Sequence, residues 1–500
     1  MKKILTIILD GFGMREDIYG NAIKNAGMNN FINIWNKYPH SLLKASGEEI
    51  GLQDKQFSSS EFGHKLLGAG RMIKDNLSIV RDNLKSNKQK NNETFNKLIN
   101  RLKDTDGNLH LITLLSDGGI SSHLDNIYMI EKIIEEKKLN TKIYIHAIAD
   151  GKDSSKFSVN KYIDELEENI KDNTKLSTVC GRYYALDTTE DYNRTKLYYD
   201  LIVYSKGVDA PNINKVIELC YSKKMTDEYI APLKTTDYKA IEQNDTVLFM
   251  NLDSRPYKQL FESLCEKKYK KFYTSSIEYE VFSLFPIDKD LNENYIFEEE
   301  TVKTTLGEYL SILGLSQARI GESAKKESLT TYFDGERKMK IDNCDLYIAD
   351  SKFDVTIDKK PEMNALTIAK TAITCMEKDY DFVVVNFANA DEIGHTGNYQ
   401  ATINGLQAID ICLGKMIECA EENFYKVVIV GSHGNADTII DRDNNIITQN
   451  TLSPVPFVIM DKKIKLRNGK ITDFAPTLLK YMDIAIPKEM KNEEVLLTKK

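Results

Sequence analysis

Short runs of β-branched and apolar residues alternate with longer amphipathic segments along most of the chain. This alternation is typical of α/β proteins, in which helices cover a mostly parallel sheet. We therefore expect an α/β fold. The clearest predicted strands are residues 4–9, 111–115, 143–149, 246–251, 382–387 and 427–431.

Several predicted strands end in polar residues that are capable of chemistry. They are Asp10, Ser116-Asp117, Asp150, Asn389-Ala390-Asp391 and Ser432-His433. In open parallel sheets, ligands bind at the carboxyl ends of the strands, so this placement favours a functional site there. Asp and Ser at such positions also cap the next helix in many proteins, so the pattern alone leaves both interpretations open.

The serine-rich segment 56–64 is the most informative single stretch of the sequence. Ser58 and Glu61 have capping-box spacing, which predicts a helix with Ser58 as its N-cap. Ser60 then lies in the first helical turn, where free backbone N–H groups favour a bound phosphate. A hydroxyl at this place is a candidate phosphoryl-accepting nucleophile if a metal or a base takes its proton.

The composition and charge of the chain argue against several classes of function. The chain has 500 residues with 41% hydrophobic content, which is enough for two or three domains with sizeable cores. Its 67 basic and 75 acidic residues give a net charge of −8 without a basic block, which argues against a nucleic-acid-binding protein. No apolar run reaches the length of a membrane span, so no membrane partner is expected. We expect a cytoplasmic, monomeric protein.

The seven cysteines are scattered without a C-x-x-C pair. Cys412 and Cys419 are seven residues apart in a predicted helix, which favours one buried face over a metal site or a disulfide.

Two segments mark predicted domain boundaries. Near residue 75 the serine-rich opening changes to a lysine- and asparagine-rich stretch, for which we expect helix over 82–100. The acidic, turn-rich segment 288–300 precedes another predicted helix at 305–313. We therefore expect one discontinuous domain, residues 1–77 and 299–500, with residues 78–298 inserted as a second domain.

The C-terminal third adds metal-binding candidates. Asp391 and His395 are four residues apart, so one helical turn could direct a carboxylate and an imidazole at one cation. A lone pair at this spacing also occurs on ordinary surface helices. Further on, Ser432-His433-Gly434-Asn435 follows a predicted strand, and Ser453-Pro454-Val455-Pro456 comes after it.

Taken in order, these segments resemble the cofactor-independent phosphoglycerate mutases of the alkaline phosphatase superfamily. The resemblance spans essentially the whole chain. It implies an alkaline-phosphatase-like domain, with a parallel-rich sheet flanked by helices, and an inserted α/β substrate domain. It also implies up to two divalent metals, Mn²⁺ or Mg²⁺, and a transiently phosphorylated serine. The segments that carry it are 5–13, 42–48, 56–64, 116–119, 181–184, 320–323, 391–395, 432–435 and 473–477.

The resemblance also implies roles for individual residues. Ser60 matches the nucleophile, Lys325 a lysine that neutralises phosphoryl charge, and Asp153 a base or orienter. The expected substrate-binding residues are His123, Lys152, Arg182 and Arg255. The expected metal ligands are Asp10, Ser60, Asp391, His395, Ser432, His433 and Asn450.

The chain also departs from the family pattern. Ser432 stands where the family has an aspartate ligand, and Asn450 stands where it has a histidine ligand, so weaker metal binding is expected. Several arginine or histidine positions of the substrate site are also altered. Lys, Thr and Ser cannot copy the bidentate guanidinium contact with an anion. The altered substrate positions are Ser121, Lys152, Thr188 and the stretch 253–256.

Our leading hypothesis is therefore that the protein is a divergent, metal-dependent enzyme that transfers or hydrolyses a phosphoryl group through Ser60. Its substrate would be a small phosphorylated or phosphonylated acid, and it would be a poor phosphoglycerate mutase. The second hypothesis is an authentic phosphoglycerate mutase, a glycolytic isomerase that converts 3-phosphoglycerate to 2-phosphoglycerate. The third is a metal-poor binding or regulatory protein. Resemblance in fold cannot choose among them, because function depends on the site.

Overall fold

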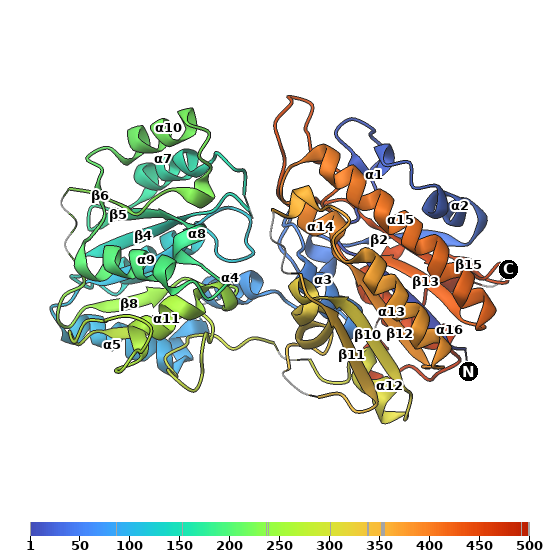
Figure 1. The fold of residues 1–500 in the computed structure, drawn as a ribbon. Helices are drawn as coiled ribbons and strands as arrows, with labels where there is room; N and C mark the ends of the chain where they lie inside the picture. Colours follow the sequence, from blue (N-terminus) through green and yellow to red (C-terminus); the bar gives the residue numbers. More distant parts are fainter. Residues whose placement is uncertain are drawn as a thin grey trace. The chain divides into compact units, whose positions relative to one another are not determined.

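The computed structural model describes residues 2–86, 88–152, 154–236, 238, 240–300, 302–337, 340–351, 356–491 and 493–498 (Figure 1). The chain forms two compact units. The first comprises Met1–Asp75 and Glu300–Lys500, and the second comprises Asn76–Glu299.

The first unit is built on an eight-stranded sheet. Its helices are α1 (Ala22–Asn25), α2 (Asn29–Lys37), α3 (Ser60–Ala69), α12 (Leu306–Ile312), α13 (Ala365–Glu377), α14 (Asn389–Gly394), α15 (Tyr399–Glu422) and α16 (Phe474–Tyr481). Its strands are β1 (Ile4–Leu9), β2 (His40–Lys44), β10 (Gln317–Glu322), β11 (Cys344–Ala349), β12 (Phe382–Phe387), β13 (Lys426–Gly431), β14 (Val455–Ile459), β15 (Lys465–Leu466), β16 (Gly469–Lys470) and β17 (Leu497–Thr498).

The strand order of this sheet is β11-β10-β12-β1-β13-β14-β2-β16. Only β14 runs antiparallel to its neighbours, β13 and β2. The central strand β1 pairs in parallel with β12 and β13, which come from the opposite end of the sequence. The carboxyl ends of these three strands therefore meet at one edge of the sheet.

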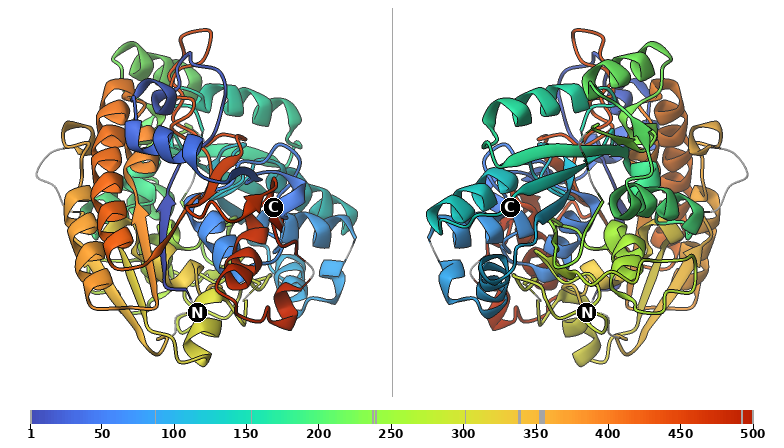
Figure 2. Two further views of the ribbon diagram at one scale, coloured as in Figure 1. Left: turned by 90° about the vertical axis from the view of Figure 1, so that its right-hand side faces the viewer. Right: turned by 90° about the vertical axis from the view of Figure 1, so that its left-hand side faces the viewer.

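Both faces of the first sheet are covered by helices (Figure 2). Side chains alternate along β1, so Leu5, Ile7 and Leu9 pack with α2, α13 and α15. Ile4 and Ile8 face the other side and pack with α3, α12 and α16. Burial on both faces explains why β1 is apolar except at Thr6, rather than alternating between apolar and polar residues.

The second unit contains a seven-stranded sheet, ordered β6-β7-β5-β4-β3-β8-β9, in which only β5 and β7 pair antiparallel. Its helices are α4 (Asn76–Lys85), α5 (Glu93–Asp104), α6 (Asp125–Glu136), α7 (Val159–Asn169), α8 (Arg182–Ala185), α9 (Tyr192–Tyr204), α10 (Ile213–Ser222) and α11 (Lys258–Cys265). Its strands are β3 (Leu109–Leu115), β4 (Ile143–Ala149), β5 (Thr174–Gly181), β6 (Val208–Asp209), β7 (Leu233–Lys234), β8 (Thr246–Phe249) and β9 (Glu280–Ser283).

The α/β prediction is confirmed, and the strands expected at 4–9, 143–149 and 382–387 have the expected bounds. The continuous helix expected over 82–100 is wrong. The chain forms two helices there, α4 and α5. A separate helix begins after Asn92, because the Asn92 side-chain oxygen accepts a hydrogen bond from the Phe95 N–H at 2.7 Å and so caps α5. Cys412 and Cys419 are both buried on α15, as their spacing predicted.

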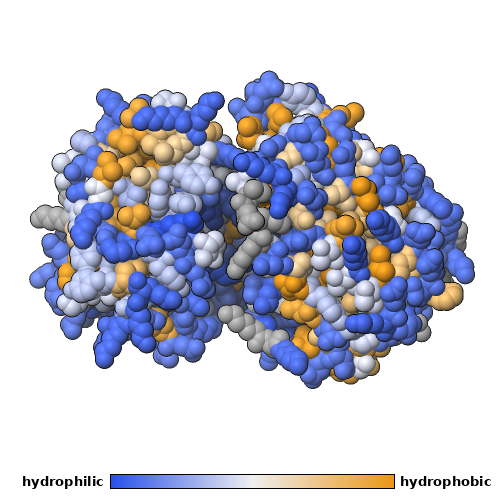
Figure 3. Space-filling model, in the orientation of Figure 1, coloured by the Kyte–Doolittle hydropathy of each residue, from blue (hydrophilic) through white to orange (hydrophobic). Residues whose placement is uncertain are grey.

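Hydrophilic residues dominate the face drawn in Figure 3, with hydrophobic residues scattered between them. Among the described residues, no helix has both the length and the apolar character that a membrane crossing requires.

A row of buried, hydrogen-bonded polar side chains crosses the second sheet. His110 on β3 and His146 on β4 are fully buried, and their Nδ1 and Nε2 atoms lie 2.9 Å apart. At one end of this row, His110 Nε2 lies 3.0 Å from Asp245 Oδ2. At the other end, His146 Nδ1 lies 2.9 Å from Thr178 Oγ1. Burial holds the pKa of His146 well below its usual 6.5.

This pKa shift predicts that the second unit loses stability in acid. Below pH 6.5 the unfolded chain protonates His146 while the folded protein does not, so the free energy of unfolding falls as the pH falls. The protection factors of amides in peptides covering β3 to β5, measured by hydrogen exchange and corrected for the intrinsic exchange rate at each pH, should therefore fall as the pH falls from 7.5 to 5.5. His146→Gln should reduce that pH dependence, whereas changing the exposed His40 to Asn should leave it intact. An equal pH dependence in His146→Gln and the unaltered protein would contradict this account.

Candidate active site

The site is built around Asp10, the residue that follows the central strand β1. Asp10 is fully buried, and its carboxylate faces side chains from the ends of two neighbouring strands. Gly11 follows it with φ +70°, and a Cβ there would lie 2.6 Å from the backbone of Asp391. Glycine at this position therefore allows the backbone after Asp10 to approach α14 closely.

Ser60 is the first residue of α3, and its hydroxyl donates to Asp10 Oδ2 at 2.6 Å. The prediction that Ser58 caps this helix is wrong. Ser59 is the N-cap, and its Oγ accepts from the Phe62 N–H at 3.2 Å. Because the helix begins one residue later than expected, Ser60 occupies the first helical position, close to the free N–H groups of the first turn.

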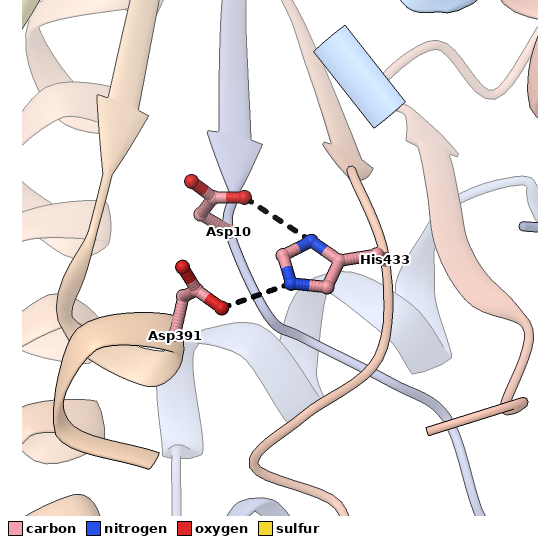
Figure 4. Close-up of side chains that lie close together, drawn as sticks. All are labelled: Asp10, Asp391 and His433. Atoms are coloured by element: carbon pink, nitrogen blue, oxygen red, sulfur yellow. Dashed lines mark hydrogen bonds and ion pairs between the residues drawn. The ribbon is translucent and has the colours of Figure 1, made fainter. Parts of the chain in front are cut away.

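Asp391 on α14 and His433 after β13 complete a group of three with Asp10 (Figure 4). His433 Nε2 lies 2.9 Å from Asp391 Oδ1, and His433 Nδ1 lies 3.4 Å from Asp10 Oδ1. One ligand atom from each of the three residues lies within 4.8 Å of the others, and all three side chains are buried. This arrangement can hold a metal ion.

His395 adds a fourth ligand candidate on the next turn. Its Nδ1 lies 2.6 Å from the Thr448 carbonyl oxygen, which can only accept, so Nδ1 carries the proton. In the neutral ring, Nε2 is then an acceptor, and it faces Asp391 Oδ1 at 3.3 Å. Two acceptors facing one another are satisfied by a cation between them, or by a proton on His395. The nitrogen and oxygen donors of this site therefore fit a divalent metal.

Lys325 brings a positive charge into the same group of carboxylates. Its ammonium contacts Asp391 Oδ2 and lies 2.8 Å from Glu392 Oε1 and 3.6 Å from Asp10 Oδ2. Burial disfavours the charged ammonium, but the carboxylates outweigh this effect and raise the pKa of Lys325.

The same balance of burial and charge acts on the other members of the site. Burial alone would raise the pKa of Asp10 and of Asp391, but Lys325 holds both below their usual range. Burial opposes protonation of His433, but Asp391 and Asp10 raise its pKa to about 10.

The two residues that depart from the family pattern lie in different surroundings. Ser432 is in the cluster, where its hydroxyl donates to Asp10 Oδ1. The Asn450 amide is engaged elsewhere: its Oδ1 accepts from Asn435 at 2.9 Å, and its Nδ2 donates to the Ser58 carbonyl at 2.8 Å. The structure thus brings together every predicted metal ligand except Asn450.

Three residues without a predicted role also belong to the site. His64 lies one turn after Ser60 and donates from Nδ1 to the Ser60 carbonyl at 2.6 Å. Asn386, at the end of β12, donates to His64 Nε2 at 3.0 Å and to Asp10 Oδ2 at 3.3 Å. The third is Glu392, beside Lys325. The spacing of Ser60 and His64, four residues apart in a predicted helix, was the only sequence signal for these contacts.

The predicted substrate residues lie in the second unit. Arg182 follows β5, and its Nη1 donates to the buried Asp150 at 2.5 Å. The Arg255 guanidinium binds Asp253, with Nη2 3.1 Å from Oδ2. Lys152 follows β4, and its backbone N–H donates to Asp150 Oδ1 at 3.2 Å. Asp153 lies outside the described residues.

His123 has a neighbour that the sequence did not indicate. Arg81 Nη2 lies 3.3 Å from His123 Nε2 and 2.7 Å from Asp125 Oδ2. Burial, followed by the charge of Arg81, lowers the pKa of His123.

Comparison with known proteins places this site in a family. Residues 2–486 match the model of the metalloenzyme superfamily. The chain is 33% identical over 495 residues to the 2,3-bisphosphoglycerate-independent phosphoglycerate mutase of Sulfurimonas denitrificans, covering 99% of this chain and 100% of that protein. It is 34% identical over 506 residues to the same enzyme of Mycoplasmoides gallisepticum, covering 99% of this chain and 100% of that protein.

A solved structure agrees with these relatives. The phosphoglycerate mutase of Leishmania mexicana, crystallised at low cobalt concentration, is 25% identical. It matches with a TM-score of 0.90 over 100% of this chain and 98% of that one. The resemblance found from motifs is thereby confirmed: the chain belongs to the 2,3-bisphosphoglycerate-independent phosphoglycerate mutases, a family of metal-dependent phosphoryl-transfer enzymes within the metalloenzyme superfamily.

Proposed function

We propose that this protein is a phosphoglycerate mutase that moves the phosphoryl group between two hydroxyls of phosphoglycerate through Ser60. The names of the full-length relatives support this hypothesis over the divergent enzyme placed first above. The observation that carries it is the hydrogen bond from the Ser60 hydroxyl to Asp10, inside a buried group of metal-binding side chains. The first unit would carry the metal and the nucleophile, and the second would hold the substrate.

The chain's own residues explain how Ser60 could react. Asp10 Oδ2 accepts the Ser60 proton in a hydrogen bond and so points the hydroxyl oxygen in one direction. The Lys325 ammonium lies near the same Asp10 oxygen, where it can neutralise negative charge on a phosphoryl group at Ser60. Asp10, Asp391, His395 and His433 would hold a divalent cation, for which Mn²⁺ and Mg²⁺ are our candidates. A bound cation would supply Lewis acidity that favours the alkoxide form of Ser60.

In the first half of the proposed reaction, the Ser60 Oγ–phosphorus bond forms as the phosphorus–oxygen bond to the substrate breaks. Ser60 Oγ gives up its proton in this step, and the substrate oxygen that loses the phosphoryl group takes up one proton to become a hydroxyl. The second half reverses these steps at the other hydroxyl of glycerate. His64 and Asn386 support the geometry, because they tie the Ser60 carbonyl to the Asp10 carboxylate.

A second candidate is a related enzyme for another small phosphorylated or phosphonylated acid. One observation favours it: guanidinium groups of the second unit are paired with carboxylates of their own chain. Arg182 binds Asp150 at 2.5 Å, and Arg194 binds Asp187 at 2.9 Å. A substrate anion would have to compete with these carboxylates, which lowers its affinity. The cytoplasmic location and the monomeric state remain predictions.

The proposed function is tested by a coupled assay from 3-phosphoglycerate to 2-phosphoglycerate with excess Mn²⁺. We expect a kcat/KM of about 10⁴ M⁻¹s⁻¹ or above, in the ordinary enzyme range. Ser60→Ala, or removal of metal by a chelator, should lower turnover by about 10³-fold or more. Ser311→Ala, at a half-buried serine of α12 whose hydroxyl donates to the Asp342 carbonyl, is the matched control and should keep full activity.

Low kcat/KM with phosphoglycerate, together with faster turnover of another phosphorylated or phosphonylated acid, would favour the second candidate. Metal binding without turnover of any such acid would favour the non-catalytic protein of the third hypothesis.

The altered metal site leads to a separate prediction. An aspartate at position 432 would add an anionic oxygen beside Asp10, where Ser432 now donates a hydrogen bond. Ser432→Asp should therefore raise Mn²⁺ affinity by about tenfold. It should also lower the melting temperature of chelator-treated protein, because two carboxylates would then repel each other.

The matched control is Ser432→Asn. Asparagine has the shape of aspartate without its charge, so this variant should not raise the Mn²⁺ affinity. Isothermal titration with Mn²⁺ measures all three proteins. An unchanged or weaker affinity in Ser432→Asp would contradict the assignment of this position to the metal site.

A further inference from the structure

Three carboxylates converge on the Lys325 ammonium, and one of them has no role in the account above. Glu392 Oε1 lies 2.8 Å from Lys325 Nζ, a normal distance for a charge-assisted hydrogen bond. The other two carboxylates, of Asp391 and Asp10, belong to the predicted metal ligands. The Lys325 side chain is 5% exposed and that of Glu392 is 24% exposed, so Glu392 lies at the outer side of the group.

The ammonium and a divalent cation draw on the same two carboxylates. Lys325 contacts Asp391 Oδ2 and is 3.6 Å from Asp10 Oδ2, while Asp10, Asp391 and His433 form the group that can hold a metal. Two cations competing for one pair of carboxylates weaken each other's binding by repulsion and by loss of partners. A carboxylate that binds the lysine alone removes part of this conflict.

We propose that Glu392 is a positioning residue that holds the Lys325 ammonium and leaves Asp10 and Asp391 to a divalent cation. An ammonium has three N–H donors, and Glu392 provides an acceptor for one of them outside the metal-binding group. The lysine can then stay near Ser60, which shares the oxygen Asp10 Oδ2 with it, while the cation binds. This inference rests on the proposed function, because it requires the site to bind metal.

The inference differs from direct ligation in a measurable way. If Glu392 acts through Lys325, its removal matters only while the lysine charge is present. If Glu392 were itself a metal ligand, its removal would weaken metal binding whether or not the lysine is charged. A double-mutant cycle separates these two cases.

The experiment is isothermal titration of Mn²⁺ into the full-length unaltered protein, Glu392→Gln, Lys325→Met and the double variant. We expect Glu392→Gln to weaken Mn²⁺ binding by about tenfold and Lys325→Met to strengthen it. In the Lys325→Met background, Glu392→Gln should change the affinity by less than about twofold. Glu362→Gln, an exposed acid of the same unit, controls for the general loss of one negative charge.

Each other outcome overturns the inference. Equal weakening by Glu392→Gln in both backgrounds would make Glu392 a direct ligand, and no weakening in either would leave it without a role at the metal. If Glu392→Gln does not fold, as judged by circular dichroism, Glu392→Asp replaces it and should weaken binding by a smaller factor that also depends on Lys325. Because the readout is metal binding, the inference can fail while the proposed function stands. Absence of Mn²⁺ binding to the unaltered protein would overturn both.

Discussion

The buried carboxylate of Asp10 is the interaction on which the active site depends. One of its oxygens accepts from Ser432 and faces His433. The other accepts from Ser60 and Asn386 and lies near the Lys325 ammonium. A buried carboxylate is stable only when it is paired and hydrogen-bonded, and these partners provide that compensation. The proposed nucleophile Ser60, the metal-binding candidates Ser432 and His433, and Lys325 thus all lie against one residue.

The sheet topology explains why distant residues meet at Asp10. Strand β1 lies between β12 and β13, so its carboxyl end adjoins theirs at one edge of the sheet. Asp391 lies on the short helix α14 after β12, and His433 is the second residue after the end of β13. Ser60 approaches at the start of α3, which packs on one face of the same sheet. The site is a consequence of parallel strand order, as expected for open α/β sheets.

Much of this could be predicted from the sequence, because apolar runs bounded by polar residues define buried strands. The positions of β1, β4 and β12 followed directly from that pattern. The helix start was misplaced by one residue, since neighbouring serines at 58 and 59 can both cap and only tertiary contacts choose between them. The amide of Asn450 could equally face a metal or its neighbours, and the structure pairs it with Asn435 and Ser58. Glu392 gave no signal, because its partner Lys325 is far away in sequence.

Anomalous scattering from a crystal grown with Mn²⁺ tests the central claim most directly. The account predicts a manganese peak within about 2.0–2.3 Å of ligand atoms of Asp391 and His433, adjoining the Asp10 carboxylate. Lys325 should contact Glu392 in the same crystal. A map in which manganese binds elsewhere, and no peak appears among Asp10, Asp391 and His433, would contradict the account.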